Sequence, residues 1–450
     1  MIKRAYNMST TEKTVLTVRE LPKSNSLNGR TVTFHSDIVR KVSDYTHGLH
    51  DYPAKYIPQI PKWAINYSKL HPGDTVLDPF CGSGTTLVEA RLMGIDSYGI
   101  DINPLARLLA KAKVTPLCSE EPHSLYKIST DLLKNIAADK DTKEAERYLN
   151  LHSNWRYWYD EKTITRLAKI KYNIENFTPS IGKNDKDAEN LKQFFLICFS
   201  SILKKCSYFD EKQIKVLRSK EKFKAGISDP YEAFKKALNS QVPKMVQFTN
   251  KCLETPSCEA KIIGNDAKSI HLPNDSIDLV VTSPPYINAI DYPFAHKYNL
   301  LILGLLKPDD YRPHSRDYIG VSERVLLKKT YNDIKLTGDA EIDFLIKKIY
   351  DVDKIRAYIM WEYFTDMRTV FKEVYRVLDK DGKFIIVVGS NYIRKNYVPT
   401  HLLLKKIAEK EGLLPNIKFF HRIQRRFLGI PRNHTGGVIR DEMVAVFKKA

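Results

Sequence analysis

The sequence has few cysteines and no long apolar run. Six cysteines are scattered over 450 residues and none belongs to a CxxC pair, so we expect reduced thiols and no disulfide framework. Cys252 and Cys258 are the nearest pair, but no histidine stands beside them at zinc-finger spacing, so no metal site is expected. No stretch approaches the roughly 18 apolar residues of a membrane span, and MIKRAYNMSTTEKT lacks an apolar signal core. We therefore expect a cytoplasmic protein without membrane association.

Acidic residues are also in short supply. The chain has 72 Lys and Arg against 53 Asp and Glu, which gives a formal charge of +19 and a pI near 9.4. An excess of this size favours a polyanionic partner, although a solvated basic surface explains the charge equally well. With 43% apolar and 28% charged residues, the chain can bury the core of one enlarged domain or of two domains.

One segment carries the strand-turn-helix pattern of a parallel βαβ unit. Asn103 is expected to cap its second helix, with Pro104 in the first turn. Its elements are a strand over Thr75–Phe80, a helix over Thr85–Gly94, a strand over Ser97–Ile102 and a helix over Asn103–Lys113.

The same pattern resumes after a long gap, with strands over Ala260–Ala267, Ser276–Thr282 and Lys383–Gly389 and a final pair, NIKFFHRI and EMVAVFKK, that forms a hairpin. The fold class we predict is α/β, a doubly wound Rossmann-like sheet interrupted twice. Its parts are a loosely held arm over residues 1–45, a catalytic domain over 46–114, 260–304 and 353–450, a helical insertion over 115–259 and a basic, loop-like insertion over 305–352.

The stretch DPFCGSGTT follows the first strand and opens a helix. Gly82 and Gly84 allow a tight turn and close approach of a ligand to the backbone at a helix N-terminus. The stretch has neither the lysine of a Walker loop nor a full GxGxxG. Asp101 ends the next strand, where a carboxylate can accept hydrogen bonds from both ribose hydroxyls. The combination predicts a nucleoside cofactor, either a dinucleotide or S-adenosylmethionine; the alternative is a helix cap beside a surface acid.

The stretch LVVTSPPYINAIDY breaks a buried strand with two prolines. Because proline cannot donate to a sheet ladder, Pro284 and Pro285 must follow the strand's end. They form a stiff loop at the carboxyl edge of the sheet, where open α/β folds bind ligands. Asp291 and Tyr292 come next and are candidates to line a pocket, although a helix N-cap explains Asp291 nearly as well. The simpler alternative for the whole stretch is a proline-rich turn with a core tyrosine.

DPFCGSGTT, TSPPY and the upstream HDYPAKYIPQ together resemble the motifs of amino-methylating DNA methyltransferases, and the SPPY form is most typical of the N4-cytosine enzymes. RVLDKDGKFIIVVG and RNHTGGVIRDEMVAVFKK are similar to later segments of the same family, so the resemblance covers most of the chain. It implies that S-adenosylmethionine is the cofactor and double-stranded DNA the partner, in a bacterial or archaeal restriction-modification system with a cognate endonuclease.

The resemblance also implies residue roles. Asp266 would contact the adenine amine with Phe80 packed near it, and Lys55 and Tyr56 would contact the methionine end, although Asp266 as a turn residue and Lys55 as a solvated lysine are the alternatives. The implied cofactor-binding residues are Lys55, Tyr56, Asp78, Phe80, Cys81, Gly82, Ser83, Gly84, Thr85, Asp101, Ile102 and Asp266.

The implied catalytic residues are Ser283, Pro284, Pro285 and Tyr286. The Ser283 hydroxyl and the Pro284 carbonyl would accept the two hydrogens of an exocyclic amine and direct its lone pair at the methyl group. Tyr286 would stack on the target base, which must leave the duplex to reach the cofactor.

Three basic segments compete as the DNA-binding region. The last 36 residues, from Pro415, hold 8 Lys and Arg against 2 Asp and Glu. The helical insertion offers Trp155 and Trp158, which we expect to serve packing rather than base readout. The second insertion carries the remaining candidates, which are Arg312, His314, Arg316 and Arg324.

Other functions remain open at this point. A C5-cytosine methyltransferase is excluded because its nucleophilic cysteine typically follows a proline, and no Pro-Cys dipeptide occurs. N6-adenine methylation uses the same chemistry, usually with Asp or Asn in place of Ser283. An RNA guanine-N2 methyltransferase, a non-catalytic nucleic-acid-binding protein and a dinucleotide oxidoreductase are the more remote alternatives.

Overall fold

The computed structural model describes most of the chain. The described residues are 15–20, 22, 25–35, 43–53, 55–139, 149, 151, 153–179, 185–213, 216–287, 291–321, 323–326, 331–423 and 440–450. In this part of the chain no helix combines the length and the apolar character needed to cross a membrane.

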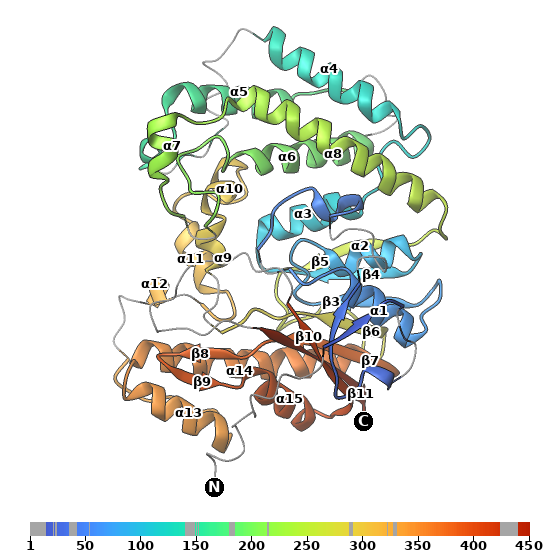
Figure 1. Cartoon of the computed structure of the whole chain (residues 1–450), viewed down its shortest axis with the longest axis vertical. Coiled ribbons are helices and arrows are strands. Elements are labelled where there is room, and N and C mark those ends of the chain that lie inside the picture. The colour runs from blue at the N-terminus through green and yellow to red at the C-terminus, as the bar shows by residue number, and fades with distance from the viewer. Residues whose placement is uncertain are drawn as a thin grey trace.

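A central sheet organises the molecule (Figure 1). In the described residues it has nine strands in the order β1-β2-β10-β11-β7-β6-β3-β4-β5. The five strands β5, β4, β3, β6 and β7 run parallel, which confirms the doubly wound class predicted from the sequence. The bounds are β3 Thr75–Asp78, β4 Asp96–Ile100, β5 Ala260–Gly264, β6 Ile277–Thr282 and β7 Leu378–Val388.

The last two strands form the expected antiparallel hairpin, β10 (Leu413–Arg422) and β11 (Asp441–Lys449). β11 inserts between β10 and β7, antiparallel to both. The segment expected to be a loose arm contributes two strands, β1 (Val15–Val18) and β2 (Thr31–Phe34), and β2 pairs with β10. The main sheet therefore continues past the hairpin by two short parallel strands.

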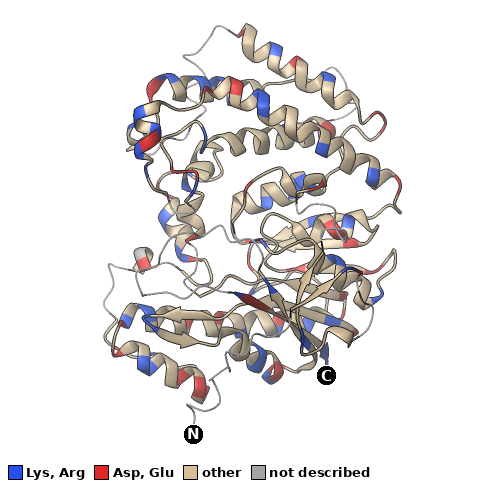
Figure 2. Ribbon diagram, in the orientation of Figure 1, with Lys and Arg blue, Asp and Glu red and all other residues tan. Residues whose placement is uncertain are grey.

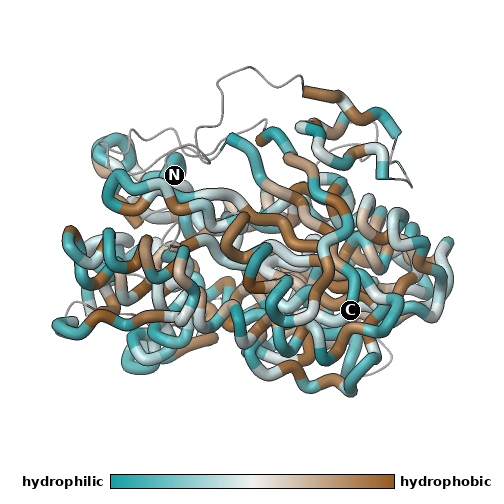
Figure 3. The backbone as a smooth tube through the Cα atoms, turned by 90° about the horizontal axis from the view of Figure 1, so that it is seen from below, coloured by the Kyte–Doolittle hydropathy of each residue, from teal (hydrophilic) through white to brown (hydrophobic). Residues whose placement is uncertain are grey.

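Alternation along the strands gives the sheet two apolar faces. On β6, Leu279 and Val281 pack with Trp63 of α1 (Gln59–Ser68), whereas Ile277 and Val280 join Met360 of the long helix α14. A strand buried on both faces is apolar at consecutive positions, as Leu279, Val280 and Val281 are in β6. In Figure 3 the strands in the middle of the molecule are mostly brown and the outer turns mostly teal.

The helices of the catalytic part flank the sheet, and the capping predicted for α3 is confirmed. Asn103 accepts a hydrogen bond from the backbone N–H of Leu105, and Pro104 begins the helix. The remaining bounds in this part are α2 Thr85–Leu92, α3 Pro104–Val114, α9 Tyr292–Ala295, α10 Lys297–Ile302, α14 Lys354–Val377 and α15 Thr400–Lys410, with the small hairpin β8 Asn391–Ile393 and β9 Asn396–Val398.

The first insertion is helical, as its sequence indicates, and stacks above α3 (Figure 1). Leu105 and Leu109 of α3 share one apolar cluster with Phe195 and Phe199 of the insertion. Trp158 is buried in the same cluster against Phe209, with 4.4 Å between ring centroids. The insertion's helices are α4 Ser124–Ala138, α5 Glu161–Glu175, α6 Asp185–Ile202, α7 Lys220–Ala225 and α8 Pro230–Leu253.

The second insertion is less loop-like than expected. It contains α11 (Tyr311–Arg316), α12 (Glu323–Leu326) and the three-turn helix α13 (Ala340–Tyr350). Asp339 caps α13 by accepting from the N–H groups of Glu341 and Ile342, and Ile342, Ile346 and Ile349 bury one face of the helix. The period of these isoleucines fits a helix, so the expectation of a loop was wrong here.

We predict that Gly84→Ala destabilises the fold more than a glycine replacement of similar backbone geometry. Gly84 has φ +84°, and a Cβ there would lie 2.9 Å from Ala110 Cα, where α2 meets α3. The backbone strain costs about 1–2 kcal/mol, and the forced contact adds about 1–3 kcal/mol.

Gly29→Ala is the matched control, because Gly29 has φ +74° and nothing within 4 Å of an added Cβ. Urea unfolding of both variants separates strain from packing. Equal shifts in the unfolding midpoint would show that the contact between an added Cβ and Ala110 does not destabilise the fold.

Candidate active site

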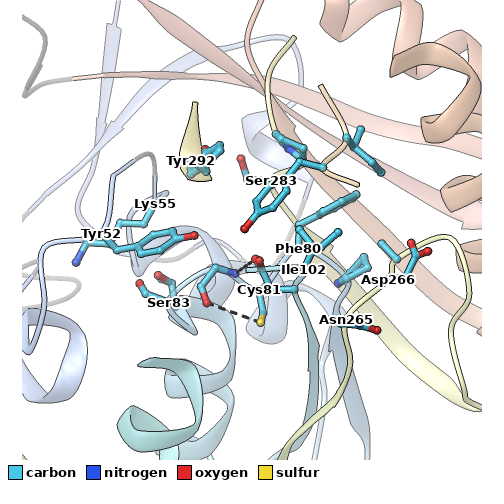
Figure 4. Close-up of a pocket in the computed structure, with 18 of the residues that line it drawn as sticks. Tyr52, Lys55, Phe80, Cys81, Ser83, Ile102, Asn265, Asp266, Ser283 and Tyr292 are labelled. Carbon is cyan, nitrogen blue, oxygen red and sulfur yellow. Dashed lines mark hydrogen bonds between the residues drawn. The ribbon is translucent and has the colours of Figure 1, made fainter. Parts of the chain in front are cut away.

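A pocket of about 800 Å³, open to solvent, lies at the carboxyl ends of β3, β4, β5 and β6 (Figure 4). Strand order reverses between β3 and β6, which is the switch point where open α/β sheets bind ligands. Of the catalytic and cofactor-binding residues proposed from the sequence, all but Asp78, Gly84, Pro284 and Tyr286 line this pocket, as does Tyr292 but not Asp291.

Asp78 lies beneath the pocket and accepts four hydrogen bonds instead of facing a ligand. Oδ1 accepts from the Thr282 hydroxyl at 2.6 Å and from the Phe80 N–H at 3.1 Å. Oδ2 accepts from the Thr86 hydroxyl at 2.5 Å and the Tyr56 hydroxyl at 3.1 Å. Burial raises the pKa of this fully buried carboxyl, against the effect of its hydrogen bonds. One side chain thereby joins the ends of β3 and β6, the start of α2 and the N-terminal motif.

The glycine turn and Asp101 form one wall of the pocket. Gly82 has φ +50°, and its N–H donates to Asp101 Oδ2 at 2.9 Å. Asp101 Oδ1 accepts from the Asn103 N–H at 2.8 Å, so the carboxylate is fixed at the end of β4. Burial raises the pKa of Asp101 to about 6. Each oxygen still has a lone pair available on the pocket side, because a carboxylate offers about four acceptor positions.

The pocket has the polar ends and apolar middle that a nucleoside cofactor requires. Ser83 Oγ is buried and has no hydrogen-bond partner among the described residues. Asp266 and Asn265 lie at the opposite end from Lys55 and Tyr52 in Figure 4. Phe80 and Ile102, which also line the cavity, supply apolar walls between the two ends. A buried hydroxyl without a partner, together with the Asp101 and Asp266 carboxylates in the lining, fits a ligand with several hydroxyl and amine donors.

The N-terminal motif closes the pocket beside the glycine turn. Lys55 donates to the backbone carbonyl of His47 at 2.9 Å, and burial lowers the pKa of its ammonium group. Lys113 is only 2% exposed, and burial followed by the charge of Lys55 holds its pKa well below the usual value. Of the two lysines only Lys55 lines the cavity, where its ammonium group can donate to a carboxylate.

The proline loop brings Ser283 and Pro285 to the pocket, whereas Tyr286 lies outside the lining and contacts the C-terminal hairpin. The Tyr286 hydroxyl donates to Glu442 Oε1 of β11 at 2.8 Å. His421 stands opposite Glu442 in the β10–β11 ladder, with Nδ1 3.7 Å from Oε2. The loop that follows β6 is thus anchored to the C-terminal hairpin.

Several pocket residues were not predicted. Asp317, Tyr318 and Ile319 of the second insertion line the cavity, and nothing in their sequence pattern marks them, because the contact depends on how the insertion folds back. Tyr52 also lines it; it lies inside the HDYPAKYIPQ motif, which is the one signal that pointed to this region.

Tyr292 lines the pocket, while Asp291 caps α9 by accepting from the Phe294 N–H. The Tyr52 ring stacks on the buried His296 at 4.8 Å and faces Tyr292 at 6.3 Å. Among the described residues, no group of three or more His, Cys, Asp or Glu is arranged to hold a metal ion.

Comparison with known proteins agrees with this geometry. A family model described as DNA methylase matches residues 5–112 and 277–450. The chain is 26% identical over 398 residues to the Type II methyltransferase M.MvaI of Kocuria varians, covering 85% of each chain. It is 24% identical over 454 residues to the Type II methyltransferase M.BsoBI of Geobacillus stearothermophilus, covering 88% of this chain and 84% of that protein.

Solved structures show only distant likeness. A TehB-like SAM-dependent methyltransferase from Corynebacterium glutamicum has a TM-score of 0.27 and 10% identity, with 87% of each chain covered. A SAM-dependent methyltransferase from Methanosarcina mazei has a TM-score of 0.30 and 11% identity, with 86% of this chain and 96% of that chain covered. At these TM-scores the likeness adds nothing to the topology described above.

We predict that Asp78→Ala lowers the free energy of unfolding by about 3 kcal/mol, because it leaves three buried hydroxyls and one N–H without their acceptor. Thr282→Val removes a single donor from the same carboxylate and is expected to cost about 1 kcal/mol. Urea unfolding measures both. Equal losses would show that the carboxylate is not the shared acceptor.

Proposed function

The chain belongs to the DNA methylase family, and on that premise we propose that it methylates the exocyclic N4 amine of cytosine in double-stranded DNA. S-adenosylmethionine is its cofactor, and it supplies an electrophilic methyl group bound to a sulfonium. The N6 amine of adenine is the alternative target, because both amines become nucleophilic only when their delocalised lone pair is localised. The observation that carries the proposal is that the glycine turn and Ser283 line one pocket at the switch point of the sheet.

We assign the cofactor to the described contacts of that pocket. Asp101 would accept from the ribose hydroxyls, with its geometry set by the N–H groups of Gly82 and Asn103. Asp266, at the other end, would accept from the adenine amine, with Phe80 beside the ring. Lys55, at the opposite end, would donate to the methionine carboxylate. Asp78 supports the site from below and Gly84 by packing, so neither is assigned a direct contact.

We assign the amine to the loop after β6. The lone pair of an exocyclic amine is delocalised into the ring, so the protein must localise it. The Ser283 hydroxyl and the Pro284 carbonyl would each accept one amine hydrogen, leaving the lone pair directed into the pocket. Pro284 and Pro285 restrict the loop, and the Thr282–Asp78 hydrogen bond fixes the residue before it. Positioning of this kind matters because about 1 Å of misplacement can cost 100-fold in rate.

We assign the flipped base to the aromatic side of the pocket. Tyr286 does not line the cavity itself; it would stack on the base beside Pro285 at the edge of the pocket, while Glu442 holds its hydroxyl. Tyr292 and Tyr318 line the cavity and offer further aromatic surface. A serine before the two prolines favours cytosine over adenine as the target, and a cognate restriction endonuclease would complete the system.

The proposed chemistry is tested by incubating the protein with labelled S-adenosylmethionine and unmodified DNA of mixed sequence. Enzymatic digestion and mass spectrometry of the nucleosides should reveal N4-methylcytosine. N6-methyladenine as the product would replace the cytosine assignment, and the absence of any methylated base with bound cofactor would contradict the proposal.

We predict that Ser283→Ala lowers kcat by at least about 100-fold, because one of two acceptors for the amine hydrogens is lost. The dissociation constant for S-adenosylmethionine should stay within about twofold, since the glycine turn and Asp101 are unchanged. Ser276→Ala, just before the start of β6, is the matched control, because among the described residues the Ser276 hydroxyl donates to the Pro273 carbonyl alone, and the backbone bonds of Ser276 survive the change. Unchanged turnover of Ser283→Ala would refute the assigned role.

We predict that cofactor binding weakens as the pH falls from 7 to 5. The pKa of Asp101 is raised to about 6 by burial, so the carboxylate that accepts the ribose hydroxyls is ionised above pH 6 and protonated below it. Calorimetric titration should give about tenfold weaker binding at pH 5, equivalent to about 1.4 kcal/mol.

Asp101→Asn should bind weakly at pH 7 and show little further change down to pH 5. Circular dichroism over the same range checks that the fold persists. An affinity of the unmodified protein that stays flat between pH 5 and 7 would contradict this role for Asp101.

A further inference from the structure

Between α6 and α8 lies a segment that contains the short helix α7 (Figure 1). We call its described residues, 204–213 and 216–226, the hairpin–helix module. Phe209 and Arg218 face each other in an antiparallel bridge. The Asp210 N–H donates to the Leu217 carbonyl at 2.8 Å, and the Ser219 N–H donates to the Tyr208 carbonyl at 2.7 Å. The short helix α7 follows directly, so the module consists of one antiparallel bridge joined to one helix.

Two basic side chains hold the module together from inside. Lys222 donates to the carbonyls of Lys204 at 3.0 Å and Ser207 at 3.2 Å, and its ammonium lies 2.6 Å from Glu211. The Arg218 guanidinium lies over the Phe223 ring at 4.1 Å and, on the neighbouring η5 turn (Trp155–Tyr157), over the Tyr157 ring at 4.4 Å. These contacts make the outer surface a fixed platform rather than a set of independent side chains.

The outer surface exposes aromatic and basic groups together. Tyr157 is 50% exposed, Leu217 48% and Phe223 58%. Lys205, Lys220 and Lys224 are also exposed, and Figure 2 shows the lysines of α7 together with its one acidic residue, Glu221. Tyr157 and Phe223 contact Arg218 on one side and still expose half or more of their surface. Rings that contact sugars beside lysines that contact phosphates are what a nucleic-acid backbone requires.

The module is joined to the active-site segment through an aromatic cluster. Phe209 packs on Trp158 at 4.4 Å and on Tyr298 at 5.0 Å. Tyr298 belongs to α10, which follows the loop that carries Ser283. In Figure 1 the helices α7, α10 and α11 follow one side of the molecule, the side on which the second insertion lines the pocket.

We propose that the hairpin–helix module binds the sugar-phosphate backbone of duplex DNA beside the extruded base. Lys205, Lys220 and Lys224 contact phosphates, while Phe223 and Tyr157 pack against deoxyribose. This proposal rests on the function proposed above, which makes DNA the substrate. It adds the protein surface that binds the DNA backbone.

The competing second insertion is less suited to this role. Its Arg316 is bound through two nitrogens to Glu362 of α14, at 3.0 and 2.5 Å. Its His314 lies 3.4 Å from the Tyr318 hydroxyl. Both side chains serve contacts within the protein. The basic stretch between β10 and β11 lies outside the described residues, apart from its ends.

The test is binding of the full chain to a fluorescent 30-base-pair duplex of random sequence, because backbone contacts need no recognition site. The variant replaces Lys205, Lys220 and Lys224 with alanine. The control replaces Lys347, Lys348 and Lys372, which are exposed lysines on α13 and α14, with the same change in net charge. The variant should bind roughly 10- to 100-fold more weakly at 100 mM salt, and its slope of log affinity against log salt should fall by about 2 to 3. The control should match the unmodified protein.

Phe223→Ala provides a second measurement. It should weaken binding roughly 3- to 10-fold while leaving the salt slope unchanged, since no phosphate contact is removed. Cofactor affinity, measured in parallel, should stay constant in all variants.

The outcomes separate the two proposals. If the unmodified protein methylates DNA but the lysine variant binds like the control, the surface is wrong and the proposed function stands. Equal weakening in variant and control would show that only net charge matters, which also overturns the surface. If the unmodified protein binds cofactor but prefers duplex RNA of the same length, the partner itself is wrong and both proposals fail.

Discussion

The geometry of the pocket depends on one buried carboxylate. Asp78 accepts hydrogen bonds from Tyr56, Thr86, Thr282 and the Phe80 N–H, four donors on four different segments. An asparagine in its place would direct its NH2 group, a donor, at two of these four donors. A carboxylate, with two acceptor oxygens, satisfies all four. Since Thr282 precedes the proline loop and Phe80 precedes the glycine turn, this contact sets the distance between the two halves of the site. Burying such a charge is costly, and full satisfaction of its oxygens offsets that cost.

The local part of this site could be predicted from the sequence. Gly82 and Asp101 were recognisable because a strand, a glycine turn and a second strand occur within some thirty residues, and periodicity reveals each of them. Asp78 was placed in the right turn, but its direction differs from expectation, because its partners come from residues up to 204 positions away. The bond between Tyr286 and Glu442 spans 156 positions. No pattern of spacing encodes such pairs, which only the folded topology brings together.

The pocket is not made by the sheet alone. Tyr318 and its neighbours come from the second insertion. The backbone at Gly320 passes close to the proline loop, since a Cβ added there would lie 3.6 Å from the Tyr286 carbonyl oxygen. The same insertion is tied to α14 through Arg316 and Glu362. The position of the cavity wall formed by Asp317, Tyr318 and Ile319 therefore depends on the contact between Arg316 and Glu362. A change in the insertion is expected to reach the chemistry through this wall.

The first insertion leaves and re-enters the catalytic domain at neighbouring points. Leu117, just after α3, donates its N–H at 3.1 Å to the Thr249 hydroxyl near the end of α8. This hydrogen bond joins the two ends of an insertion of more than a hundred residues. The entropic cost of lengthening such a loop grows only logarithmically. The first insertion can therefore change in length at a modest entropic cost, while the strands that carry the pocket keep their order and register.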